Sequence, residues 1–511
     1  MVLTELPNEI FLLIVDQLGP KDLILHRRVN KQFHTAFTEN ELNYHFLQHH
    51  FPRVKELRHV EDWRARTDWS EQFSRVVRRY HHLQSGRPRG IEIAGLGKSF
   101  IAPTWSRSYP VVPWRRHLQF EEKTAQFHYP DTLWTYDDGL LVFPSAELKS
   151  YAVYDLSARI LNEIDIDSGN KIVRRIRLKE KTLIIEWCET EPYHQLNEYE
   201  KVHRHFTTSY DICLDPRTGK YQSIFRNEWK IHFLGFPLNS RDRFYSTHNK
   251  NHYAIYIWQP NRSAWGEDEP IEMLAIWDIS RPSAYRPSTD PTGNCKPADE
   301  VDGPNIIRRF TFLDLGFYGI RQRSSPTFRA LELDENHVYF ICEDHRWLVG
   351  AQSSDRHPRL HKVKSTGIPF GSGPHWEDEC GADGDVNLSF CERNSDDRSP
   401  GTAPCWRHEE FPYLTITEAL DAEAGVIFSA RHCFMLETIS INIKPKIKMI
   451  GPGYEISLRD GLWQQLLGKG KICGDERWLI GENTRDEVVI LHFDQEGGSE
   501  GGISAMDRLA I

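Results

Sequence analysis

The sequence predicts a multidomain α+β protein in which a small helical region is followed by an all-β domain. Residues 1 to 86 show helical periodicity and helix-capping residues. From about Gly90 onward, short runs of β-branched and aromatic residues alternate with turns rich in Gly, Asp, Asn and Pro. Hydrophobic residues make up 39% of the 511 residues and aromatic residues 12%, which is enough for packed cores.

Composition also restricts the class of protein. The net charge of −10 argues against general nucleic-acid binding, and no apolar run approaches the roughly 18 residues that a membrane span needs. The segment Met1 to Glu9 lacks the basic residues of a secretory signal. The 9 cysteines include no C-x-x-C pair and are typical of reduced thiols. We therefore expect a cytoplasmic or nuclear protein with no membrane or nucleic-acid partner.

The helical region is punctuated by residues that begin and end helices. Pro7 suits a first helical turn, Gly19-Pro20 ends that helix, and Asn30 can cap a later one. Gly86 is placed to end the last helix. The first predicted helix therefore begins near Pro7. Further helices are predicted at 21–28, 31–39 and 42–51, and the last runs from Asp68 or Ser70 to about Leu83.

The β region repeats weakly. An apolar run ends in an aromatic residue followed by Asp at Tyr154-Asp155, Tyr210-Asp211, Trp277-Asp278 and Phe493-Asp494. Repeats of four strands at roughly 40 to 50 residues are typical of propeller blades, and long loops would stretch that period. The pattern favours a β-propeller, although a sandwich or a pair of smaller β domains would give a similar list of strands.

These patterns predict the domain boundaries. Two stretches rich in Pro, Gly, Ser and Asp are expected to be loop insertions, at about 280–305 and 367–412. The Gly-rich and Glu-rich end is expected to be a flexible tail. The predicted segments are a small helical domain at 1–45, a helical spacer at 46–89, a β-rich domain at 90–495 and the tail at 496–511.

The first helix is apolar almost all the way round. Every residue from Ile10 to Val15 is apolar, whereas a helix that lies on one core needs a single apolar stripe. Ile10, Ile14 and Leu18 form one stripe, and Phe11 with Val15 lies beside it. A domain of this size cannot cover all of these side chains, so a partner is expected to cover the second stripe.

Three motif elements in this region resemble the F-box. They are L-P-x-E-I from Leu6, L-x-x-x-D-L from Leu18, and V-N-K-x-F from Val29. Their order and spacing match the family over about residues 4 to 45. Asn30 stands where the family often has cysteine, and Phe33 stands where it often has tryptophan.

The resemblance implies that this unit packs on the Skp adaptor of a cullin–RING ubiquitin ligase. The residues expected to make or support that interface match both the motif and the apolar face. They are Leu6, Pro7, Ile10, Ile14, Leu18, Leu23, Val29 and Phe33. The resemblance also implies that the β-rich domain captures a protein substrate, as in family members that carry a repeat domain.

Other chemical motifs are weak. Gly95 to Ser99 resembles the end of a phosphate-binding loop, but Glu92 stands where that loop needs glycine. One insertion contains His375, Cys380, Cys391, Cys405 and His408, without the spacing of a zinc site. Several arginine pairs could bind an acidic or phosphorylated peptide or could simply be solvated: Arg174-Arg175, Arg241 with Arg243, Arg308-Arg309, and Arg321 with Arg323. We expect no catalytic residue, metal or cofactor.

The sequence therefore predicts the substrate-recognition subunit of a Skp adaptor–cullin–F-box ubiquitin ligase, without catalytic activity of its own. One alternative is an interaction module that binds the adaptor without cullin. Another is a propeller enzyme with an attached F-box, which would need a polar pocket with perturbed carboxylates or histidines.

Overall fold

The structure is a computed structural model, and it places most of the chain. The residues that it describes are 6–58, 67–97, 132–145, 150–166, 169–238, 243–262, 269–296, 303–323, 327–347, 359–383, 414–421, 423–433, 436–443, 454–458, 462–467 and 471–494. The chain forms two compact units. The first contains Met1–Ala94 and Thr415–Ile511, and the second contains Gly95–Leu414. Their bounds differ from the segments expected from the sequence, and those segments remain predictions.

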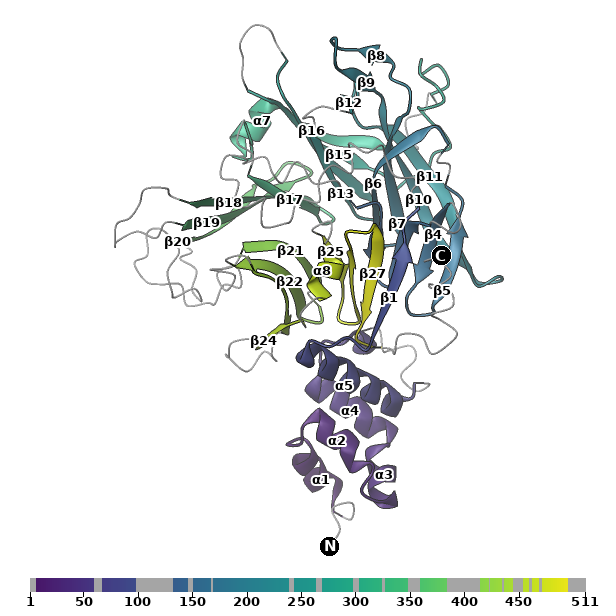
Figure 1. Cartoon of the computed structure of the whole chain (residues 1–511), viewed down its shortest axis with the longest axis vertical. Coiled ribbons are helices and arrows are strands. Elements are labelled where there is room, and N and C mark those ends of the chain that lie inside the picture. The colour runs from purple at the N-terminus through teal and green to yellow at the C-terminus, as the bar shows by residue number, and fades with distance from the viewer. Residues whose placement is uncertain are drawn as a thin grey trace. The chain divides into compact units, whose positions relative to one another are not determined.

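The first unit begins with a bundle of helices (Figure 1). The helices are α1 (Asn8–Val15), α2 (Pro20–His26), α3 (Lys31–Phe37), α4 (Asn40–His50) and α5 (Trp69–Ser85), with a short 3-10 helix, η2 (Lys55–Leu57). Capping residues explain where two of these helices begin and end. At the start of α3, the Asn30 side chain accepts a hydrogen bond from the Phe33 N–H. At the start of α5, the Asp68 side chain accepts one from the Glu71 N–H, and at its end Gly86 has a left-handed φ of 61°. The caps expected at Asn30 and Gly86 are confirmed.

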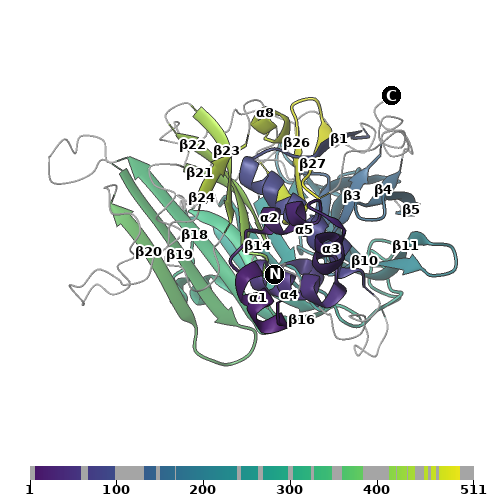
Figure 2. The ribbon, with the colours of Figure 1, turned by 90° about the horizontal axis from the view of Figure 1, so that it is seen from below.

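These helices share one hydrophobic core. Val15 of α1 and Leu23 of α2 are buried with side chains of α3, α4 and α5. The buried members of this helical core are Val15, Leu23, Phe37, Leu42, Phe46, Leu47, Val54, Trp69, Phe73, Val76, Val77 and Tyr80. Figure 2 shows α1 and α3 on the side of the bundle where the chain begins. The apolar N-terminal helices therefore belong to the same packed body as α5.

Two four-stranded antiparallel sheets complete the first unit. One contains β21 (Leu414–Asp421), β22 (Val426–Cys433), β23 (Leu436–Ile443) and β24 (Tyr454–Ser457). A short helix, α8 (Leu462–Leu466), follows it. The other sheet has the order β1-β27-β26-β25 and is built from β1 (Gly90–Gly95), β25 (Ile472–Gly474), β26 (Trp478–Glu482) and β27 (Glu487–His492). The strand that directly follows the helices thus closes the last sheet of the chain.

The second unit contains four further four-stranded sheets among its described residues. The first of them contains β2 (Thr135–Asp137), β3 (Leu140–Pro144), β4 (Tyr151–Asp155) and β5 (Ile160–Ile164), and the second contains β6 (Lys171–Lys179), β7 (Thr182–Glu189), β10 (His205–Asp215) and β11 (Lys220–Lys230). The third contains β13 (Arg243–His248), β14 (His252–Gln259), β15 (Ile271–Asp278) and β16 (Asn305–Phe310). The fourth contains β17 (Phe328–Leu333), β18 (His337–Trp347), β19 (Arg359–Pro369) and β20 (Trp376–Asp383).

Smaller elements decorate these sheets. A three-stranded sheet is inserted between β7 and β13, with strands β8 (His194–Gln195), β9 (Lys201–His203) and β12 (Phe236–Pro237). A short helix, α7 (Phe312–Phe317), follows β16. The described residues between β15 and β16, 279–296 and 303–304, contain no helix or strand.

The strand connectivity is that of a β-propeller. Each of these sheets is an antiparallel meander of four strands, and β1, from before the first sheet, completes the last one after β27. The aromatic-Asp pairs all belong to the third strand of a meander: those in β4 and β15 end the strand and Phe493-Asp494 directly follows β27, but Tyr210-Asp211 lies inside β10, which continues to Asp215. The predicted fold class, helices followed by an all-β propeller, is confirmed.

One expected loop is partly wrong. The insertion predicted at 367–412 contains the end of β19 and all of β20. The β20 sequence, WEDECGAD, is acidic and has low strand propensity, but β19 pairs with it from Leu360↔Asp383 to Gly367↔Trp376. Gly367 marks no loop: a Cβ there would lie 2.3 Å from Nε1 of Trp376, so the glycine makes room for that ring.

Candidate functional site

The outer face of α1 is an exposed apolar surface. Val15 is completely buried and Phe11 packs against the helical core, so one stripe of α1 faces inward. The other stripe faces solvent: the exposed fraction is 45% for Ile10, 66% for Leu13 and 40% for Ile14. The helix is therefore apolar on a face that the described residues leave exposed, as the sequence predicted.

Exposed apolar side chains also occur in and just after α2. Leu25, in α2, is 45% exposed and Val29, just after α2, is 62% exposed. Phe33, in α3, is partly buried, and its ring stacks on that of His26 at 6.1 Å and on that of Phe37 at 5.8 Å. We call the set Ile10, Leu13, Ile14, Leu25 and Val29 the apolar face.

The predicted adaptor-binding residues divide by burial. Pro7, Ile10, Ile14 and Val29 are exposed, and Leu6, Leu18 and Phe33 are intermediate. Leu23 is 1% exposed, so it supports the helices from inside and cannot touch a partner. Leu13 and Leu25 are exposed but absent from the predicted set, because the motif pattern does not include them. The unbroken apolar run from Ile10 to Val15 was the signal that could have identified Leu13.

A buried polar junction fixes the helices that carry the apolar face. Arg27 donates to Ser74 Oγ of α5 and to Asn43 Oδ1 of α4, each at 2.6 Å. The Asn43 amide in turn donates to the carbonyl oxygens of Phe37 at 3.0 Å and Glu39 at 2.6 Å. Burial lowers the pKa of Arg27, against the opposing effect of Asp68. These bonds tie the end of α2 to α3, α4 and α5.

Helix α5 joins the bundle to the last sheet through a buried charge cluster. Arg79 is completely buried and lies 2.8 Å from Glu476 Oε1, 3.2 Å from Glu56 Oε2 and 3.3 Å from Asp494 Oδ1. Arg75, one turn earlier, donates from Nε to Asp494 Oδ2 at 2.7 Å. We call these five residues the junction cluster.

In the junction cluster, the effect of burial on each pKa is opposed by the neighbouring charges. Burial would raise the pKa of Glu56 and of Asp494, but Arg79 beside both, together with Arg75 beside Asp494, holds each pKa below its ordinary value. Burial raises the pKa of Glu476 despite Arg79. The carboxylates draw the pKa of Arg79 well above its usual value although burial acts in the opposite direction. The cluster therefore keeps the Arg79 guanidinium paired with carboxylates away from water, while Arg75, which is partly exposed, pairs with Asp494 at its margin.

Apolar packing surrounds the cluster. Tyr80 belongs to the helical core, and its hydroxyl donates to Glu476 Oε2 at 2.9 Å. Leu83, one turn later on α5, is buried against the sheets, in a cluster with Phe428, Val489 and Phe493. A single helix thus contributes to both cores of the first unit, so the N-terminal helices and the last two sheets form one continuous body.

The arginine pairs are mostly used inside the fold. Arg175 lies 3.2 Å from Glu186 Oε2, and Arg321 pairs with Glu269. Arg308 donates to main-chain oxygens of Pro369 and Gly371. Arg241 lies outside the described residues. Of the pairs considered from sequence, Arg309 keeps an exposed side chain on a strand.

The weak nucleotide and metal motifs gain no support. Glu92 is buried in β1 and lies 3.4 Å from His492, where it cannot cradle a phosphate, and Lys98 and Ser99 fall outside the described residues. Cys391, Cys405 and His408 also fall outside them. In the part of the chain that the structure places, no group of three His, Cys, Asp or Glu residues could hold a metal ion. Among the same residues, no helix is long and apolar enough to cross a bilayer.

Comparison with known proteins identifies one domain. The family model of the F-box domain matches residues 3–45, which include α1, α2 and α3. A search of curated proteins finds no match.

Solved structures show only distant likeness. A chain of the mitotic checkpoint complex aligns with a TM-score of 0.31 at 8% identity, covering 72% of this chain and 91% of that chain. The β-propeller domain of Myceliophteria thermophila Cps50 (Swd1) aligns with a TM-score of 0.30 at 11% identity, covering 69% and 92%. These scores are too low to support an argument, and the propeller assignment rests on the strand pairing described above.

Proposed function

We propose that the F-box domain of residues 3–45 makes this chain the substrate-recognition subunit of a Skp adaptor–cullin–F-box ubiquitin ligase. The observation that carries the proposal is the apolar face, in which Ile10, Leu13 and Ile14 are 40 to 66% exposed on one short helix. Full burial of a large apolar side chain contributes about 1.5–3 kcal/mol, so covering these half-exposed residues would supply several kcal/mol of binding energy.

In this role the chain performs no chemistry of its own. The F-box helices would hold the adaptor and, through it, the cullin–RING scaffold, while the β sheets hold a protein substrate. Attachment to one assembly makes the transfer of ubiquitin to a substrate lysine effectively intramolecular. The partner enzymes carry out that transfer.

The junction cluster supports this division of labour. A flexible connection between adaptor and substrate sites would lower the effective concentration of the substrate at the transferring enzyme. Helix α5 instead packs in the helical core through Phe73 and Val76 and in the sheet core through Leu83. Buried Arg79 links the two. The adaptor position is thereby fixed relative to the last two sheets.

Co-expression with the Skp adaptor followed by gel filtration tests the proposal. The wild-type chain should co-elute with the adaptor, and the variant Ile10→Asp/Ile14→Asp should not, because two charges would be buried without partners in the interface. Both positions are exposed, so the variant should still fold. A matched control, Leu214→Asp/Ile224→Asp, changes residues of 51 and 52% exposure on β10 and β11 and should co-elute like the wild type.

The outcomes separate the competing functions. Failure of the folded wild-type chain to bind the adaptor would contradict the proposal. Addition of purified cullin–RING to the complex then distinguishes a ligase receptor from a module that binds the adaptor alone. A receptor should form the larger complex, whereas an adaptor-only module should leave cullin in its own fraction.

A further inference from the structure

We propose that the outer edge of β16, together with α7, is the surface on which the substrate docks, and that the substrate presents an extended segment with acidic and apolar side chains. This inference rests on the receptor function proposed above and adds the location and the chemical class of the segment that is recognised. The docking would be strand addition, in which the segment extends the sheet β13-β14-β15-β16.

β16 offers an open edge with apolar side chains. It is the last strand of its sheet, and among the described residues its one hydrogen-bonded neighbour is β15, from Leu274↔Phe310 to Asp278↔Asn305. A strand at an edge presents main-chain N–H and C=O groups that can pair with another chain. Ile306 is 46% and Ile307 41% exposed on this strand.

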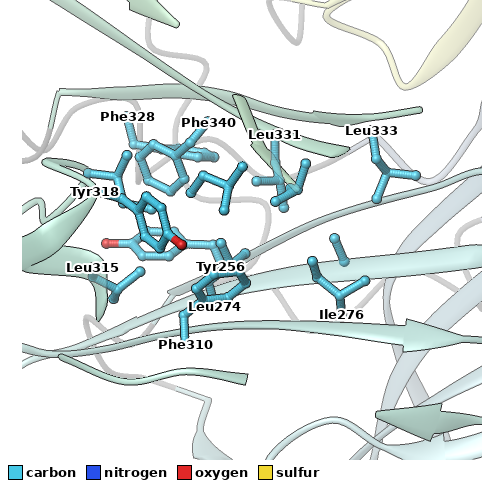
Figure 3. Close-up of a cluster of buried hydrophobic side chains, with 14 of the residues drawn as sticks. Tyr256, Leu274, Ile276, Phe310, Leu315, Tyr318, Phe328, Leu331, Leu333 and Phe340 are labelled. Atoms are coloured by element: carbon cyan, nitrogen blue, oxygen red, sulfur yellow. The ribbon is translucent and has the colours of Figure 1, made fainter. Parts of the chain in front are cut away.

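Helix α7 extends the apolar surface and is firmly held. Leu315 is completely buried and Tyr318 is 7% exposed, and Figure 3 shows both side chains gathered with Phe310 and Tyr256 in the core beneath. The opposite side of the helix carries Leu313, which is 77% exposed, and Phe317, which is 74% exposed. Because the inner side chains anchor α7, the outer ones are presented at fixed positions, which lowers the entropy cost of binding.

The charge of the edge favours an acidic partner. Arg308 donates to the carbonyl oxygens of Pro369 at 2.8 Å and Gly371 at 2.9 Å and to the Tyr318 hydroxyl at 2.9 Å, so its hydrogen-bond acceptors are all neutral. Arg309 is exposed on the same strand. The carboxylate of Asp314 accepts the Thr311 N–H and hydroxyl, each at 2.7 Å.

Arg308 lies close enough to Asp314 to help lower the pKa of that carboxyl, after the hydrogen bonds from Thr311. Two arginines against one carboxylate still leave this edge with a net positive charge, in a chain whose net charge is −10. Carboxylates of a docked segment would make charge-assisted hydrogen bonds to Arg309. A second copy of this chain fits the edge poorly, because pairing β16 with itself would bring the arginines of both copies together.

Peptide selection on the full-length chain, with and without the adaptor, tests the proposal. The probe is a phage-displayed library of random peptides of about 12 residues, long enough to form a strand. Enriched peptides should contain acidic residues that alternate with apolar ones. Their affinity should be measured by fluorescence anisotropy. It should fall by about tenfold or more in Arg309→Glu and in Leu313→Asp, because each substitution removes one direct contact with the peptide. Lys220→Glu on β11 and Leu214→Asp on β10 are exposed controls that should leave the affinity unchanged.

N-methylation of the best peptide tests strand addition itself. Successive N–H groups of a strand point to opposite sides, so methyl groups on one alternating set should abolish binding while those on the other set should have little effect. Equal effects of both sets, enrichment of basic peptides, no enrichment, or unchanged affinity in Arg309→Glu and Leu313→Asp would overturn the proposal. Adaptor co-elution in the same preparations reports separately on the receptor function, so the two failures are distinguishable.

Discussion

Arg79 and Glu476 are 397 positions apart in the chain, yet they lie 2.8 Å from each other with both side chains completely buried. This contact fastens the helix that follows the F-box to the sheet formed by the last strands of the chain. Because Glu56 and Asp494 share the same guanidinium, Arg79 compensates several carboxylates at once. Its removal has consequences that can be measured.

Replacement of Arg79 by methionine should destabilise the protein by about 3–5 kcal/mol, because carboxylates would remain buried without their partner. Chemical denaturation followed by tryptophan fluorescence would measure the change. Arg78→Met on the exposed side of the same helix is the matched control and should cost less than about 0.5 kcal/mol. Similar losses in both variants would show that the junction cluster does not stabilise the fold.

Leu13 and Leu23 should respond in opposite ways to truncation. Leu23→Ala removes a buried side chain and should lower the free energy of unfolding by about 2–5 kcal/mol. Leu13→Ala, at a residue 66% exposed, should leave stability almost unchanged and weaken adaptor binding. Thermal denaturation and surface plasmon resonance against the adaptor would separate the effects. Full-strength adaptor binding by folded Leu13→Ala would remove α1 from the proposed interface.

As the pH falls, the second unit should lose stability at a higher pH than the junction cluster does. Burial lowers the pKa of His248 to about 3 and that of His205 well below its usual value. Since the unfolded chain binds these protons near pH 6.5, stability is complete above that pH. Below pH 6.5, the free energy of unfolding should fall by about 1.4 kcal/mol per pH unit for each of these two histidines. Glu56 and Asp494 have lowered pKa values, so their contribution is lost only below about pH 4.

Hydrogen exchange resolved by peptide would measure this order. Between pH 6.5 and 5, after correction for intrinsic exchange rates, peptides from β10 and β13 should lose protection while those from α5 and β27 keep it. His248→Gln should make the loss less steep, because glutamine does not titrate. Simultaneous loss in both units, or an unchanged slope in His248→Gln, would contradict the assignment.

Two glycines with positive φ should differ sharply in their tolerance of alanine. At Gly235, with φ of 84°, a Cβ would lie 2.0 Å from the main-chain oxygen of His203. At Gly219, with φ of 66°, nothing lies within 4 Å. Gly219→Ala should therefore cost about 1 kcal/mol from backbone strain alone, and Gly235→Ala considerably more. Equal unfolding free energies for the two variants would show that the turn at Gly235 relaxes freely.

The aromatic-Asp pairs show how far a sequence pattern can be interpreted. The predicted end of an apolar run coincides with the end of a strand at Asp155 and Asp278, but β10 continues past Asp211 to Asp215. The aspartates also have different partners. Asp155 and Asp278 accept N–H groups of the turns that follow, whereas Asp211 pairs with Arg226. Asp494 instead binds Arg75 and Arg79 of α5. The local pattern locates a strand, but it does not tell whether the partner of the carboxylate is the next turn, as for Asp155 and Asp278, or a residue far along the chain, as for Asp494.

The candidate site shows the same limit. The motif and the apolar run predicted an uncovered face on the first helix, where Ile10 and Ile14 are exposed, and Val29, just after α2, is exposed as well. The sequence could not separate Leu23 from them, because burial depends on which neighbours a side chain meets after folding. The β20 strand was missed for a related reason, since its acidic sequence becomes a strand only through pairing with β19.

The sequence by itself determined the helices, the β-rich character of the rest of the chain, the propeller fold class and the F-box, because each depends on local spacing of apolar, capping and turn residues. Only the tertiary structure decided that the F-box helices and the last two sheets form one body. The physical reason is that the stabilising contacts, such as that between Arg79 and Glu476, join residues hundreds of positions apart. No local pattern encodes the burial of those contacts.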